Sequence, residues 1–192
     1  MPQNTNESIY MIADTHFGDD TSILRYERRP FADEESMNRD MMETWNTIVK
    51  PEDTIFHLGD FSSELSFEEN KDIVQQLNGR KILIMGNHDR IFSVKEWMEI
   101  GFDEVYSMPV IFQGFYMLSH EPLYVTWNSP YANIFGHVHN NPAYRDVSAR
   151  SYCVCVERTD YAPVSFDTIR TTIAEQDKIK RNRSIHKSTR NE

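Results

Sequence analysis

Residues 82–90 read Ile-Leu-Ile-Met-Gly-Asn-His-Asp-Arg, an apolar run that ends at a glycine and continues in polar side chains. Such a run is typical of a buried strand that delivers its next residues to the carboxyl edge of a sheet, where open α/β sheets bind ligands. Asn87 offers an amide oxygen, His88 an imidazole that titrates near neutral pH, and Asp89 a carboxylate able to fix its tautomer. Taken alone, the stretch also fits an ordinary turn.

Four further polar motifs follow apolar, β-branched or aromatic runs in the same way. They are Asp14-Thr15-His16, Gly59-Asp60, Ser119-His120 and Gly136-His137-Val138-His139. Five of the seven histidines therefore lie at the ends of expected strands, together with Asp and Asn side chains. Because one metal ion takes about four protein ligands, this inventory predicts two metal ions at a common edge.

The five motifs, in this order, resemble the signature of the calcineurin-like metallophosphoesterases: Asp-x-His, Gly-Asp, Gly-Asn-His-Asp/Glu, His and Gly-His-x-His. The resemblance spans residues 14–139, most of the chain. It implies an α/β fold in which two mixed β-sheets pack as a sandwich flanked by helices, with metals at the carboxyl ends of the strands. The interval between His16 and Gly59 is longer than in many small members, so the resemblance defines the ligands better than the loops near the first metal.

By the same resemblance, seven side chains bind two divalent ions. The first ion takes Asp14, His16, Asp60 and His139, and the second takes Asp60, Asn87, His120 and His137. Asp60 is expected to bridge the ions, because a carboxylate has two oxygens to share. A water or hydroxide between the ions would be the nucleophile, its pKa lowered toward about 7. Imidazole, carboxylate and amide ligands favour Mn, Fe or Zn, and Mn²⁺ is the first expectation.

His88 is not a ligand in this scheme, which leaves it free to protonate the leaving oxygen. We expect Asp89 to hold the imidazole of His88 in place and to raise its pKa. These two residues are the predicted catalytic pair.

Arginines near the first and third motifs are candidates for contacts with the substrate phosphate, because an arginine fork matches phosphate bidentately. Arg25, Arg28 and Arg29 follow the first motif, and Arg29 is preferred because Pro30 stiffens its setting. Arg90 follows the third motif and is the other candidate. Exposed loop arginines without a function remain the common alternative.

The expected function is that of a dinuclear metal-dependent phosphoesterase acting on phosphodiester or phosphomonoester bonds of a nucleotide or other small molecule, with diesters favoured. One alternative is a scaffold of the same fold that binds metal or protein without turnover, although such a scaffold has no need of a proton donor like His88. A nuclease and a protein phosphatase are further alternatives. Aromatic residues Tyr124 and Trp127, in the loop after His120, could stack on a nucleobase or pack at the core edge.

Composition sets the remaining limits. The chain has 192 residues, enough for one domain, which we place at residues 1–177. Residues 178–192 carry a net charge of +5 and are predicted to form a basic, flexible tail, leaving −15 on the rest. The acidic body does not favour nucleic acid as a partner.

No apolar run reaches the roughly 20 residues that cross a bilayer, and residues 1–7 do not resemble a secretory signal, so the cytoplasm is expected. Nothing in the sequence indicates an oligomeric state.

Local patterns predict several elements. Asp33 is a plausible N-cap for a helix whose apolar residues recur at helical spacing until Pro51. Capping-box patterns beginning at Ser66 and Ser93 predict two more helices. The pair Gln113-Gly114, between two apolar runs over residues 105–112 and 115–118, predicts a hairpin.

Overall fold

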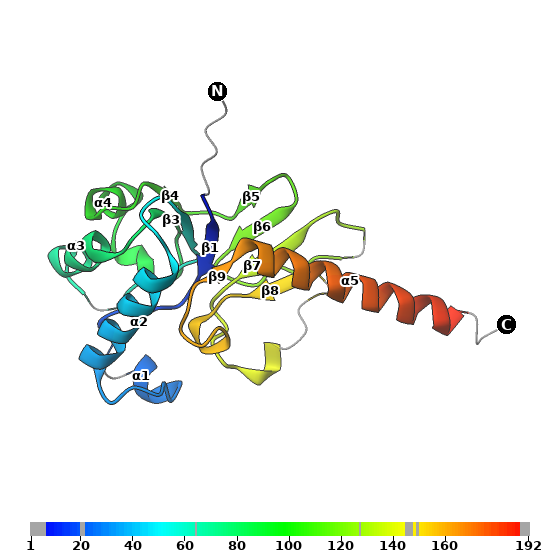
Figure 1. Ribbon diagram of the computed structural model, residues 1–192, viewed down its shortest axis with the longest axis horizontal. Helices are drawn as coiled ribbons and strands as arrows, with labels where there is room; N and C mark the ends of the chain where they lie inside the picture. Colours follow the sequence, from blue (N-terminus) through cyan, green and yellow to red (C-terminus); the bar gives the residue numbers. More distant parts are fainter. Residues whose placement is uncertain are drawn as a thin grey trace, which may run out of the picture.

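The structure is a computed structural model that describes residues 7–19, 22–63, 65–126, 128–144, 148 and 150–188. Two β-sheets pack together in it, with helices on the outside (Figure 1). The predicted fold class, a sandwich of two mixed sheets flanked by helices, is confirmed.

The first sheet carries the amino-terminal half of the chain. Its strand order is β4-β3-β2-β1-β9, in which β1 to β4 run parallel and β9 pairs antiparallel with β1. The bounds are β1 (Ile9–Ile12), β2 (Thr54–His57), β3 (Arg80–Ile84), β4 (Glu104–Tyr106) and β9 (Val164–Ser165). The parallel strands β1, β2 and β3 therefore end at the same edge.

The second sheet has the order β5-β6-β7-β8, with bounds β5 (Val110–Phe112), β6 (Tyr116–Ser119), β7 (Ala132–Phe135) and β8 (Ser151–Cys153). Strands β5 and β6 form the predicted antiparallel hairpin through Gln113-Gly114, whereas β6, β7 and β8 are parallel. The apolar run over residues 105–112 was expected to form one strand. It instead contributes to two strands, β4 and β5, which lie in different sheets.

The helices connect the strands. Their bounds are α1 (Ile23–Tyr26), α2 (Glu34–Ile48), α3 (Phe67–Gln76), α4 (Val94–Ile100) and α5 (Phe166–Ser188), with 3-10 turns η1 (His88–Ile91), η2 (Pro142–Tyr144) and η3 (Val156–Arg158). Helices α3 and α4 begin with the predicted capping boxes at Ser66 and Ser93, and α2 begins with the predicted N-cap Asp33, which also forms a capping box with Ser36. Each box satisfies backbone N–H groups that a helix start leaves free.

Alternation along the strands produces two apolar layers. Met11, Phe56 and Ile82 contact residues of the second sheet such as Leu118 and Ile134. Their neighbours in the strands, Ile12, Ile55 and Leu83, point the other way, toward α2, α3 and α4. Trp45 and Trp97 of these helices are almost fully buried there. Because side chains alternate across a strand, a strand buried on both faces reads as a continuous apolar run. The two layers hold the strand ends in fixed positions.

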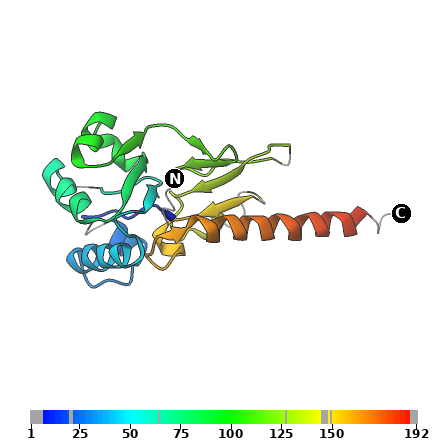
Figure 2. The same ribbon diagram turned by 45° about the horizontal axis from the view of Figure 1, so that its top comes forward.

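Helix α5 begins on the inter-sheet layer and then leaves it. Phe166, Ile169 and Ile173 pack against that layer, after which the helix extends away from the sheets (Figure 2). The backbone is helical through Ser188, and residues 189–192 lie outside the described part, so the flexibility predicted for the basic tail at residues 178–192 stays a prediction. The separation of a 1–177 domain from its tail stays a prediction. None of the helices in the described ranges has the length and apolar character needed to cross a bilayer.

Candidate metal centre

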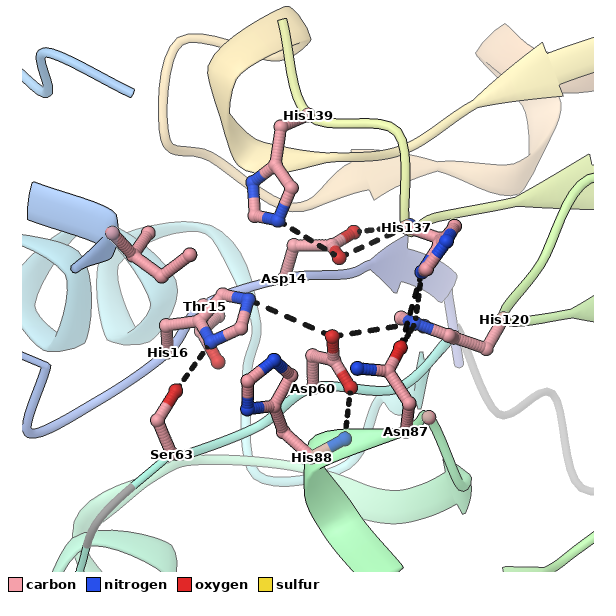
Figure 3. Close-up of polar contacts among 12 residues, drawn as sticks. Asp14, Thr15, His16, Asp60, Ser63, Asn87, His88, His120, His137 and His139 are labelled. Atoms are coloured by element: carbon pink, nitrogen blue, oxygen red, sulfur yellow. Dashed lines mark hydrogen bonds and ion pairs between the residues drawn. The ribbon is translucent and has the colours of Figure 1, made fainter. Parts of the chain in front are cut away.

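The carboxyl ends of five strands meet at one place, where the predicted ligands face one another (Figure 3). Strands β1, β2 and β3 bring residues of the first three motifs, and β6 and β7 bring the remaining histidines from the second sheet. The ligand atoms form overlapping groups: Asp14, His16 and His139; His16, Asp60 and His88; and Asp60, His120 and His137. Within each group the atoms lie within 4.8 Å of one another.

The tightest group is the predicted second metal site. The Nε2 atom of His120 lies 3.1 Å from Asn87 Oδ1 and 3.1 Å from His137 Nδ1. The same nitrogen lies 3.3 Å from Oδ2 of Asp60. Four atoms that all favour a cation therefore converge from four strand ends, two in each sheet.

The predicted first metal site lies on the other side of Asp60. His16 Nε2 is 3.7 Å from Asp60 Oδ2, and His139 Nε2 is 3.7 Å from an oxygen of Asp14. A single oxygen of Asp60, Oδ2, thus faces both sites. The other oxygen, Oδ1, accepts the backbone N–H of His88 at 2.9 Å. Asp60 thus lies between the two predicted sites, and its role as the ligand common to both ions stays a prediction.

Two observations show that these residues fit divalent cations. The Nε2 atom of His16 is buried and has no hydrogen-bond partner, although unpaired buried polar atoms are rare in proteins. Burial lowers the pKa of His120, but hydrogen bonding to Asp60 and the negative charge of Asp14 outweigh it and raise that pKa to about 9. The donor set therefore attracts positive charge and contains only hard or borderline ligands, which suits Mn, Fe or Zn.

Comparison with known proteins now identifies the family. The family model for calcineurin-like phosphoesterases matches residues 8–183. The chain belongs to the calcineurin-like phosphoesterases. The uncharacterized protein MJ1445 of Methanocaldococcus jannaschii is 33% identical over 168 residues, covering 84% of this chain and 88% of that protein.

A solved structure is also similar. The crystal structure of AQ665 from Aquifex aeolicus, described as a protein of unknown function, has a TM-score of 0.69 and 29% sequence identity to this phosphoesterase. The similarity covers 87% of this chain and all of the other.

Partners behind the ligands fix the orientation of three histidines of the phosphoesterase. The Nδ1 atom of His120 lies 2.9 Å from the carbonyl oxygen of Leu58, that of His16 lies 2.6 Å from Ser63 Oγ, and that of His139 lies 2.9 Å from Glu157 Oε1. Such contacts direct Nε2 toward the metal and tune its basicity. Neither Ser63 nor Glu157 was predicted, although Glu157 follows the apolar run that ends at Val156, as the ligands follow theirs.

Arg29 does not have the substrate-binding role that was expected. Its guanidinium is buried and donates to the backbone oxygens of Asp14 and Thr15, at 2.6 and 2.7 Å, and to Glu157 at 2.7 and 3.0 Å. All these contacts are within the protein, so no fork remains for a phosphate. Arg29 instead holds the segment that carries Asp14 against the carboxylate that orients His139.

Asp89 also differs from its prediction. Its carboxylate accepts the backbone N–H groups of Gly86, Asp60 and Phe61 at 2.7 to 2.9 Å, and is not bonded to the His88 ring. Burial, reinforced by the charge of Asp60, raises the pKa of Asp89 to about 6 despite these hydrogen bonds. Asp89 therefore ties the loop after β2 to the loop after β3, which fixes the Asp60 and Asn87 backbones relative to each other.

His88 lies beside the two sites with its ring half-buried. The ring packs edge-on against that of His16, with centroids 5.0 Å apart, and makes no hydrogen bond to any residue that the structure describes. A proton on this imidazole is thus available to a bound molecule. Because the ring is also close enough to His16 and Asp60 to approach a metal, its role as a non-ligand stays a prediction.

The ligand backbone is locally strained. Asp14, His16, Asp60, His137 and His139 have φ values between 45° and 71°, a left-handed region that residues other than glycine rarely adopt. Such conformations cost about 1–3 kcal/mol each and concentrate at functional sites, where the surrounding packing maintains them. The two apolar layers therefore hold the backbone of five predicted ligands in this conformation.

Proposed function

We propose that the protein hydrolyses a phosphodiester bond of a small molecule with two divalent ions, Mn²⁺ being the first choice for assay. The observation that carries this proposal is the position of Asp60, whose Oδ2 atom faces His16 on one side and His120 on the other. A carboxylate placed between two sets of cation ligands supports a pair of ions that would have Asp60 as a common ligand. Paired ions of this kind clamp the attacking and leaving oxygens of a displacement at phosphorus.

The protein's own groups have distinct tasks in this proposal. Asp60, Asn87 and the four ligand histidines would hold the ions, with Asp14 completing the first site. The imidazole of His88 would donate its proton to the leaving oxygen, which is the reason that its ring must stay free of protein partners. General acid catalysis of this kind contributes about 10²–10⁴ in rate.

Charge favours a diester over a monoester. A monoester brings a second negative charge near neutral pH, and phosphate dianions are commonly bound by arginine forks. The arginine expected to supply such a fork, Arg29, is fully engaged by the protein. The net charge of −10 supports a small molecule rather than a nucleic acid as the substrate.

The test compares hydrolysis of bis(p-nitrophenyl) phosphate and p-nitrophenyl phosphate by metal-stripped protein reloaded with Mn²⁺. We expect turnover of the diester, with loss in Asp60→Ala prepared identically. Turnover of the monoester alone would replace the proposal with a phosphatase. Absence of turnover on either ester, with metal bound, would favour the non-catalytic scaffold.

A further inference from the structure

A cavity of about 200 Å³ opens beside the second metal site. Three of its lining residues, Ser107, Met108 and Pro109, lie in the segment between β4 at the edge of the first sheet and β5 at the edge of the second. Figure 1 shows these two strands. His120 belongs to both the cavity lining and the predicted second metal site, and Gly86 of the lining lies against Asp60 and His120, so the cavity borders the metal centre. A substrate bound at the metal centre would therefore have this space beside it.

The chemistry of the lining selects what could enter. Met85, Met108, Pro109 and Leu123 present an apolar surface that includes two thioethers. Methionine sulfur is polarizable and makes favourable contacts with aromatic rings. On this apolar part of the lining a sugar or a chain of phosphates would lose hydrogen bonds, because burying polar groups without partners costs free energy.

Polar groups stand at the border of the same cavity. Arg90 and Glu121 both line it, which provides donors and a carboxylate acceptor. Arg90 is exposed and forms no ion pair with any described residue. An apolar slot with donors and acceptors at its border suits a flat ring that carries heteroatoms on its edge. A volume of about 200 Å³ accommodates one ring system, whereas whole small-molecule sites usually measure 300–1,000 Å³.

We propose that this cavity binds a nucleobase-sized heteroaromatic group on one ester of the substrate, so that the substrate class is a nucleoside phosphodiester. This inference rests on the proposed function and adds the identity of one substituent. Met85 and Met108 would contact the faces of the ring, and Arg90 would interact with its edge or with the adjacent phosphate.

The first test is direct binding, measured without turnover. Protein carrying ¹³C-methyl methionine and loaded with Zn²⁺ is titrated with adenosine 5′-monophosphate and, separately, with ribose 5-phosphate, which lacks the base. Ring currents should shift the Met85 and Met108 methyl signals with the nucleotide alone, while Met37 and Met41 in the helix-side layer stay unchanged. Met85→Leu and Met108→Leu assign the signals. Equal responses to both ligands, or none at the two pocket methionines, would overturn the inference.

The second test uses kinetics. Thymidine 5′-(p-nitrophenyl phosphate) and methyl p-nitrophenyl phosphate release the same phenolate, so they differ only in the retained ester. We expect the parent protein to have a lower KM for the thymidine ester than for the methyl ester. In Met108→Ala, the ratio of the KM for the thymidine ester to the KM for the methyl ester should rise about 3- to 10-fold. Met98→Ala is the matched control, because Met98 is an exposed methionine on α4 outside the cavity lining.

The outcomes separate the two proposals. If both esters are hydrolysed and Met108→Ala leaves the ratio of their KM values unchanged, the base-binding role of the cavity is wrong and the proposed phosphodiesterase activity is supported. If neither ester is hydrolysed but the nucleotide shifts the pocket methionines, the base site stands and the proposed reaction fails.

Discussion

Glu157 accepts a hydrogen bond from Nδ1 of His139 at 2.9 Å, although the two residues come from different loops. Its carboxylate is also paired with buried Arg29. The contact sets the tautomer of His139 and leaves Nε2 facing Asp14, which makes Glu157 a positioning residue for the first metal site.

Replacing Glu157 by Gln should therefore weaken binding at the first site about 10- to 100-fold, because partners behind a ligand typically have effects of this size. Calorimetric titration with Mn²⁺ measures the affinities of the two sites separately. Glu175→Gln, an exposed residue of α5, serves as the control and should match the parent. Unchanged affinity in Glu157→Gln would remove this role.

His88→Ala should retain two metal ions and slow diester hydrolysis about 10²- to 10⁴-fold, as expected for loss of a general acid. The defect should shrink as the leaving group becomes more acidic, because such a group departs without protonation. Metal analysis of the same sample is the decisive companion measurement. If the variant loses an ion, His88 is a ligand and the proton donor lies elsewhere.

Arg29→Ala should lower the free energy of unfolding by about 3–5 kcal/mol, since removing one partner of a buried ion pair leaves the other charge uncompensated. Urea denaturation measures this loss. Arg39→Ala is the matched control, because Arg39 pairs with Asp40 at the surface, where a pair contributes about 0–1 kcal/mol. A stable Arg29→Ala protein with a raised KM would restore the original substrate-binding prediction.

His57 predicts a specific pH dependence of stability. The side chain is buried, and its Nε2 atom lies 2.9 Å from Thr15 Oγ1. Burial lowers the pKa of His57 to about 3. Above pH 6.5 the residue is neutral in both folded and unfolded chains and has no pH-dependent effect. As the pH falls from 6.5 toward 3, only the unfolded chain takes up the proton, so stability is lost at about 1.4 kcal/mol per pH unit.

In His57→Asn, the loss of unfolding free energy between pH 6.5 and pH 5 should accordingly be smaller than in the parent by about 2 kcal/mol. Denaturant titrations of metal-stripped protein at the two pH values measure it. Trp45→Phe, a change in the ring that stacks on His57, should lower stability while keeping the parent's pH dependence. Identical pH dependence in parent and His57→Asn would show that His57 titrates normally.

The meeting of the candidate ligands at one place could be predicted from sequence because they obey a local rule. Each follows a run of apolar residues, and parallel strands with such runs end at one edge of a sheet. This rule places Asp60, Asn87 and His120 without knowledge of the loops between them, whereas their roles as ligands come from the resemblance to the family and stay predictions. The helix starts at Asp33 and Ser66 also follow from local patterns, since a capping box needs only four consecutive residues.

The side-chain partners could not be predicted, because they depend on contacts that no local pattern encodes. Arg29 pairs with Glu157, which is 128 residues away in the chain. Asp89 adjoins His88 in sequence, yet the η1 turn directs its carboxylate to the backbone N–H of Asp60, 29 residues earlier. The left-handed backbone at five predicted ligands is favoured by their residue types, Asp and His, but its position in the chain depends on packing.

If Asp60 is a ligand common to two ions, as proposed, those ions must lie close together, and electron paramagnetic resonance of protein loaded with two equivalents of Mn²⁺ tests this claim most directly. Ions that share a ligand oxygen are magnetically coupled, so we predict the spectrum of a coupled pair, converted by Asp60→Ala to that of isolated Mn²⁺. A spectrum of isolated Mn²⁺ from the fully loaded parent protein would contradict the claim.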